Sequence, residues 1–352
     1  MFGALKSAPR ADNDYSACSG CSLCLLVCPV WRTTHDLRLT PHGRAKALQH
    51  GASIVDIAAS VESCTLCSAC EPVCPENIDL VGMILKLRRQ LPRSAALHDV
   101  QTRVNTAAVR PPVARADTRS VLLPDKGLRA QSKALAQVHA LLACPSAEDD
   151  GADIALSLET GVYVPDQRIE QFLAPLRGVK HIIVADGLLL RHLKSWLPKS
   201  KISSLGVALI ALPAVRCGLR ATDLYVIEPR AYHSDQKRLV ALYDQLRFDT
   251  GCTMNLDLLR IAIPAAARGL HDCVKPRPIV DIEQALWVVQ GRKFSRVVAE
   301  SVDDMAALSL ATDKPVVHVS ELNNIFYETP EETHRKAGGA TTTDDSACVR
   351  LM

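Results

Sequence analysis

The sequence predicts an α+β protein of two domains, an all-helical first domain and an α/β second domain made of two similar halves. Cysteines recur through the first 75 residues with helical periodicity between them, and strand-then-helix patterns follow residue 178. The chain has 352 residues, 48% hydrophobic and 22% charged, which suits two cores. We expect domains at 1–95 and 134–329, a linker at 96–133, and a disordered Thr-, Gly- and Asp-rich tail at 330–352.

Eight cysteines repeat one spacing twice, each time with proline after the fourth. They are Cys18, Cys21, Cys24 and Cys28, then Cys64, Cys67, Cys70 and Cys74. The run C-x2-C-x2-C-x3-C-P is typical of proteins with two [4Fe-4S] clusters, in which the fourth cysteine binds the other cluster. The spacing therefore predicts two sets of ligands: Cys18, Cys21, Cys24 and Cys74, and Cys64, Cys67, Cys70 and Cys28. Because every corner of each cluster would carry a thiolate, we expect single-electron transfer and no catalytic residue.

Other uses of these cysteines fit less well. Zinc sites usually place two Cys-x2-Cys pairs a dozen or more residues apart, and disulfides normally need an even count, whereas this chain has 13 cysteines and no recognisable signal peptide. A net charge of +3 and 4% aromatic residues do not indicate nucleic-acid binding. The longest apolar runs fall short of the ~18 residues of a membrane span, so we expect a cytoplasmic protein.

Helices are predicted around the second motif. Thr40 as N-cap and Pro41 at the first position begin a helix that ends before Gly51. An apolar face over residues 54–61 predicts a second helix, and Asp79 is a cap for a third. Basic residues of this domain fit a solvated surface, although they could also raise cluster potentials or bind an acidic partner: Arg32, Arg38, Arg44, Lys46, Lys86, Arg88, Arg89 and Arg93.

The second domain begins with a clear strand-then-helix unit. Residues 181–185 form a buried-strand pattern, Asp186 is a cap, and residues 188–196 are amphipathic. The same order returns later, with strands at 296–299 and 315–319 around a helix at 302–310. The recurrence predicts two copies of an α/β unit.

The N-terminal motifs resemble those of a known family. Beside the cysteine runs, the resemblance rests on Pro41-His42-Gly43-Arg44 and on Cys74-Pro75-Glu76-Asn77-Ile78-Asp79. This family holds the iron-sulfur subunits of glycolate oxidase and anaerobic glycerol-3-phosphate dehydrogenase, and the C subunit of heterodisulfide reductase. The resemblance covers residues 10–95 and implies an all-helical ferredoxin domain in a hetero-oligomer. It implies a flavoprotein donor, either an FAD dehydrogenase or an electron-transferring flavoprotein, and a quinone or other carrier as acceptor, with peripheral attachment at the inner face of the membrane as an option.

The second domain resembles the duplicated Cys-Cys-Gly domain of that family with its cysteines lost. Residues 223–230 resemble a segment of such domains, but Cys252 stands alone, and Ala185-Asp186-Gly187 and Glu300-Ser301 stand where cysteine would be expected. We expect the remaining internal cysteines to be packing residues. The alternative is a third metal site on Cys217, Cys252 and Cys273.

Two other functions stay open at this point. One is a catalytic subunit that reduces a disulfide or a quinone with a further cluster in the second domain, and the other is an iron-sulfur adaptor or redox sensor. No Gly-rich phosphate loop is present, so no nucleotide cofactor is indicated. His233 and His271 lie near the candidate cysteines in sequence, but we expect them to be surface or core residues.

Overall fold

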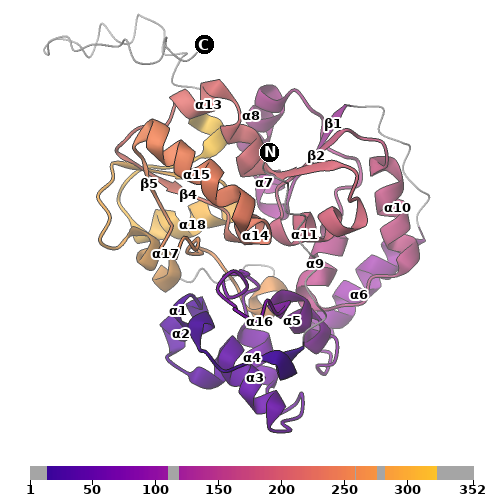
Figure 1. The fold of residues 1–352 in the computed structure, drawn as a ribbon. Helices are drawn as coiled ribbons and strands as arrows, with labels where there is room; N and C mark the ends of the chain where they lie inside the picture. The colour runs from indigo at the N-terminus through magenta and orange to yellow at the C-terminus, as the bar shows by residue number, and fades with distance from the viewer. Residues whose placement is uncertain (1–13, 110–118, 258, 276–281, 323–352) are drawn as a thin grey trace, which may run out of the picture.

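The computed structural model describes residues 14–109, 119–257, 259–275 and 282–322. In these ranges a helical N-terminal part lies against a larger α/β part that contains two parallel sheets (Figure 1). The predicted mixture of helix and sheet is confirmed. The tail predicted at 330–352 lies outside the described residues. Among the helices that the structure describes, none is long and apolar enough to cross a membrane.

Side-chain caps begin the helices of the N-terminal part where the sequence places them. Thr40 accepts a hydrogen bond from the Gly43 amide at 3.1 Å, and Asp79 accepts one from the Gly82 amide at 3.0 Å. The second helix is shorter than predicted, because Asp56 accepts from the Ser53 amide at 2.8 Å and holds its start as a turn. The elements are η1 (Tyr15–Ala17), α1 (Leu23–Leu26), α2 (Pro29–Thr34), η2 (Leu37–Leu39), α3 (Pro41–Gln49), α4 (Ala58–Ser63) and α5 (Leu80–Arg88).

The segment predicted as a linker at 96–133 is largely regular structure. Helix α6 (Ala95–Ala108) packs against α9 (Ala152–Thr160) and α10 (Asp166–Leu176), and its side chains Leu97, Val100 and Val104 are buried. The prediction failed because the sparse apolar residues of α6 are spaced for one narrow helix face. The Pro-Pro stretch within 110–118 lies outside the described residues.

The first sheet has the order β1-β2-β3, and all of its strands are parallel. Its strands are β1 (Ser120–Leu123), β2 (His181–Val184) and β3 (Lys201–Ser204). Asp186 accepts from the Leu189 amide at 2.7 Å, so the predicted cap begins α11 (Gly187–Trp196). The other helices of this region are α7 (Lys126–Ala130), α8 (Ser132–Leu142), α12 (Leu205–Ile210) and α13 (Pro213–Cys217).

The second sheet has the order β5-β4-β6-β7 and is also parallel. Its strands are β4 (Asp223–Val226), β5 (Thr253–Met254), β6 (Arg296–Ala299) and β7 (Val316–His318). The accompanying helices are α14 (Pro229–Ser234), α15 (Gln236–Thr250), α16 (Leu270–Cys273), α17 (Ile282–Val289) and α18 (Val302–Ala311). The predicted strands and helices are present in both units, while the idea that the sheets are copies of one unit stays a prediction.

The two parts of the molecule share hydrophobic core. One buried cluster runs from Val61 and Ile84 of the N-terminal part to Ile154 and Leu188 of the α/β part. A smaller cluster joins Val27 and Cys67 to Ile261. Burial of apolar surface across this boundary holds the cysteine loops against the α/β part.

Candidate iron-sulfur site

Left-handed backbone turns arrange the cysteines. Ser22, between Cys21 and Cys24, has φ of +65°, and Leu66 and Ser68, between Cys64 and Cys70, have φ of +53° and +62°. Non-glycine residues seldom adopt this conformation, which persists only when the surroundings enforce it. Alternation of right- and left-handed residues turns successive amide groups toward one side and creates an anion-binding hollow. Both motifs therefore have the backbone form that suits an anionic ligand.

Two small cavities are lined by four cysteines each. The first cysteine cavity is lined by Cys18, Cys21, Cys24 and Cys74. The second cysteine cavity is lined by Cys28, Cys64, Cys67 and Cys70. These are the two groups that the motif spacing predicts, with the fourth cysteine of each run in the other group.

The two cysteine cavities differ in exposure. Cys21 is exposed in the first, whereas Cys28 and Cys67 are buried in the second. Burial raises the pKa of Cys24 to about 11 and that of Cys28 to about 12. Such thiols keep their protons at neutral pH unless a metal replaces them, because a metal binds the thiolate.

A buried positive charge, that of Arg44, indicates whether the second cysteine cavity suits an anionic cluster. This guanidinium group lines the cavity and is 1% exposed. It donates to the Ser60 carbonyl at 2.7 Å, its Nε has no hydrogen-bond partner, and no carboxylate pairs with it in the described part of the chain. A buried cation without an anion is costly. A cluster held by four thiolates is anionic and would balance this charge, so the residues fit the group.

Three side chains of the α/β part bond to the second cysteine loop, residues 64–74. Arg230 donates to the Thr65 carbonyl at 3.2 Å, and the His233 ring bonds the Cys67 carbonyl at 2.7 Å. Arg191 donates to Glu71, which follows Cys70, at 2.6 Å and 3.1 Å. The second loop is therefore held from outside its own domain, which sequence analysis did not foresee.

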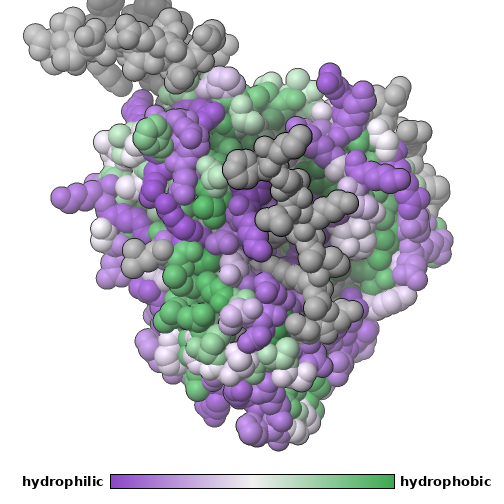
Figure 2. All heavy atoms as spheres, viewed as in Figure 1, coloured by the Kyte–Doolittle hydropathy of each residue, from purple (hydrophilic) through white to green (hydrophobic). Residues whose placement is uncertain are grey.

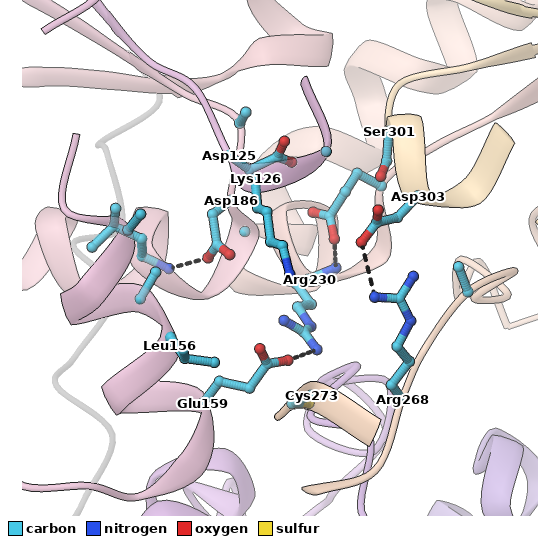
Figure 3. A pocket seen from close by; sticks show the side chains of 18 of the residues that line it. Asp125, Lys126, Leu156, Glu159, Asp186, Arg230, Arg268, Cys273, Ser301 and Asp303 are labelled. Carbon is cyan, nitrogen blue, oxygen red and sulfur yellow. Dashed lines mark hydrogen bonds and ion pairs between the residues drawn. The ribbon is translucent and has the colours of Figure 1, made fainter. Parts of the chain in front are cut away.

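A larger cavity of about 430 Å³ adjoins the second cysteine cavity, and Cys67 lines both. Part of its wall comes from segments that follow strands of the two parallel sheets, which carry Asp125 after β1, Asp186 after β2, Arg230 after β4 and Ser301 after β6 (Figure 3). The carboxyl ends of parallel strands are where open α/β sheets bind ligands. The size lies in the range of small-molecule sites.

Charged side chains of the large cavity range from buried Asp304 to exposed Asp303, and several of them are paired. Arg230 binds Glu159 at 2.5 Å, and Arg268 lies 3.4 Å from Asp303 (Figure 3). Burial raises the pKa of Glu228 to about 8, because its carboxylate is removed from water. For the same reason the pKa of Asp304 is about 7 and that of Asp125 about 6. Carboxyl groups of this cavity can therefore hold protons near neutral pH.

The remaining cysteines do not meet at one place. Cys252 is buried in a core cluster, Cys217 is exposed at the end of α13, and Cys273 lines the large cavity. Within the residues that the structure describes, no three His, Cys, Asp or Glu side chains are placed to hold a single metal ion. Asp186 and Ser301, which belong to the two stretches where the resemblance leads one to expect cysteine, both line the large cavity.

Several contributors to the site carry no sequence signal for their role. Arg44 and Arg88 were expected on a solvated surface, but they are 1% and 2% exposed, so this expectation was wrong for both. His233 was expected to be either a surface or a core residue, and it is a buried core histidine. Of these three residues, only Arg44 lies in a motif on which the resemblance rests, and that motif gave no hint of burial.

The comparison with known proteins concerns the N-terminal part. Residues 14–78 match the family model of a 4Fe-4S dicluster domain. No curated protein and no solved structure matches the chain. The match includes all eight motif cysteines, from Cys18 to Cys74. The chain therefore carries a 4Fe-4S cluster-binding domain at residues 14–78, similar to the 4Fe-4S dicluster domains.

Proposed function

We propose that this chain is an electron-transfer protein with two [4Fe-4S] clusters, one in each cysteine cavity. The observation that carries the proposal is the sorting of eight cysteines into two groups of four, each drawn from both motifs. Cys18, Cys21, Cys24 and Cys74 hold one cluster, and Cys28, Cys64, Cys67 and Cys70 hold the other. When bound, a [4Fe-4S] cluster accepts and donates one electron at a time.

The protein residues position these groups and control access to them. All eight thiolates are used as ligands, so the protein leaves no ligand position for a substrate. Cys21 exposes the first site to solvent, whereas Cys67 and the α/β part cover the second. An electron-donating partner therefore reaches the first site more easily.

The surface near the first site offers a place for such a partner. In α1, which follows Cys21, Leu26 is 65% exposed, and in α17 Leu286 is 43% exposed. Figure 2 shows hydrophobic side chains gathered over α17 and α1. An apolar patch beside an electron-transfer site favours docking of another protein. We propose a flavoprotein, either an FAD dehydrogenase or an electron-transferring flavoprotein, as this partner in a hetero-oligomer, and a quinone or another carrier as the final acceptor.

The proposal is tested by counting iron and acid-labile sulfide in anaerobically purified protein. We expect about eight of each per chain. The Cys67→Ala variant should retain about four, because it removes one ligand of one cluster only. Cys217→Ser is the matched control and should retain all of them. A wild-type count near four, or a zinc-loaded protein, contradicts the proposal.

A second candidate function uses the large cavity. Because Cys67 lines this cavity as well as the second cysteine cavity, a small molecule bound there would lie beside the second cluster. In this case the chain would itself reduce a disulfide or a quinone, without a further cluster. Rapid mixing of the reduced protein with each class of compound tests it. The measured quantity is the rate at which the reduced protein is oxidised. A slower rate for Asp186→Asn, with an unchanged rate for the surface variant Asp36→Asn, would favour this function. Equal rates for the wild type and both variants would exclude it.

A further inference from the structure

We propose that Arg44 and Arg88 are the counter-charges of the second cluster, and that they raise its reduction potential above that of the first. The inference rests on the proposed function and adds the direction in which electrons move between the two clusters. Electrons that enter beside the exposed Cys21 would then collect at the second site. The two arginines are positioning residues, since they act on a bound group and do not touch a substrate.

Arg44 supplies a positive charge that the described residues do not neutralise. Its guanidinium group is buried in the wall of the second cysteine cavity and donates to the Ser60 carbonyl, and no carboxylate pairs with it in the described ranges. The same cavity wall contains Cys28, Cys64 and Cys70, so the guanidinium group faces the space that these cysteines surround. The cation therefore belongs with the cysteine thiolates.

Arg88 supplies a second such charge from α5. It donates to the backbone carbonyls of Cys64, Val61 and Glu159, and no carboxylate pairs with it in the described ranges. The nearby Glu159 side chain is already paired with Arg230 at 2.5 Å. Because Arg88 bonds Cys64 on one side and α9 on the other, the α/β part holds this cation beside the second loop.

Other charges near the second loop cancel in part. Arg230 is paired with Glu159, whereas Arg191 is paired with two carboxylates, Glu71 and Asp79, which leaves one negative charge in that group. Asp79 is 42% exposed, so water screens this excess charge more than it screens a buried guanidinium group. The buried cations without a paired carboxylate in the described ranges are Arg44 and Arg88.

The first site has a weaker cationic environment. Lys46, which is half-buried, donates to the Cys18 carbonyl at 3.4 Å and to Gln49 at 2.8 Å. Water and salt screen a charge in this position, whereas they screen a buried guanidinium group far less. Reduction adds one negative charge to a cluster, so a buried neighbouring cation favours the reduced form. The two sites should therefore differ in potential.

The experiment is a redox titration of the anaerobic holoprotein followed by electron paramagnetic resonance. In the wild type we expect the second cluster to be reduced at the higher potential. Arg44→Met and Arg88→Met should each move the potential of the second cluster to more negative values and leave the first in place. Arg44→Lys and Arg88→Lys should keep the potential of the second cluster close to that of the wild type, because lysine retains the positive charge although it does not retain the exact packing.

Two variants identify the signals and serve as controls. Cys21→Ser should alter the signal of the first cluster only. Lys46→Gln, which removes an outer charge near Cys18, should leave the potential of the second cluster unchanged. If Arg44→Met fails to assemble, the Arg88 pair and the order of the wild-type potentials still decide the question.

The outcomes separate this inference from the proposed function. Equal potentials, reduction of the first cluster before the second, or methionine variants that match the wild type would overturn the inference while two clusters remain. A single cluster in the iron count would overturn the proposed function instead.

Discussion

The ring of His233 joins the cysteine loop to the α/β part through the backbone of Cys67. Its Nδ1 lies 2.7 Å from the Cys67 carbonyl oxygen, and its Nε2 accepts a hydrogen bond from the Ala262 amide at 3.1 Å. Because Nε2 accepts, Nδ1 carries the proton and donates to Cys67. The histidine is buried, so both bonds are protected from water.

Replacing His233 by leucine should destabilise the holoprotein. The change leaves the buried Cys67 carbonyl and Ala262 amide without partners, which costs on the order of 1–3 kcal/mol for each group. Anaerobic denaturant titration followed by circular dichroism measures the loss. The control is His271→Leu, whose side chain is 66% exposed and should change stability by about 0.5 kcal/mol or less. Equal stability of the two variants would contradict a structural role for His233.

Arg191→Met should weaken the boundary between the two parts. Arg191 is the cationic partner of Glu71, whose side chain is fully buried, so the variant leaves a buried carboxylate uncompensated at a cost of about 3–5 kcal/mol. Hydrogen exchange in α5 and α11 reports the loss. Adding Glu71→Gln to Arg191→Met should recover part of it. Arg216→Met, which breaks the half-exposed pair with Asp249, is the control and should cost about 1 kcal/mol or less.

Stability should fall with rising pH through the titration of Glu228. Burial raises the pKa of this carboxyl to about 8. The folded protein therefore holds the proton more tightly than the unfolded chain does, and this stabilisation is present at low pH and is lost as pH rises toward 8. Thermal unfolding of wild type and Glu228→Gln between pH 5 and 9 measures the effect. The wild type should lose stability relative to the variant over this range, and parallel curves would show that Glu228 titrates normally.

Serine replacements of Cys217, Cys252 and Cys273 should leave the iron content unchanged. Cys217→Ser should also leave stability unchanged, since this side chain is exposed. Cys252→Ser should cost about 1–3 kcal/mol because it buries a hydroxyl group in an apolar core. Iron analysis of the three variants checks the expectation. Loss of iron from any of them would revive the third metal site.

Local signals explain most of what could be predicted. Thr40, Asp79 and Asp186 begin their helices as expected, because a cap depends on contacts within four residues of the chain. Strands at 181–185 and 296–299 were predicted because a continuous apolar run suits a strand buried in a parallel sheet, and the structure has them at 181–184 and 296–299. Helix α6 was missed, since its apolar residues are few and depend on α9 and α10 for burial.

The sequence by itself determined the chemistry of the cysteine sites, because the spacing of eight cysteines restricts which metal group they can hold. Only the tertiary structure decided which charges surround them. Arg44, Arg88, Arg191 and Arg230 look alike in sequence, yet Arg44 and Arg88 are buried without a carboxylate among the described residues, whereas Arg191 and Arg230 are paired. The physical reason is that a charge acts through its burial and its neighbours, and these come from segments up to 165 residues apart.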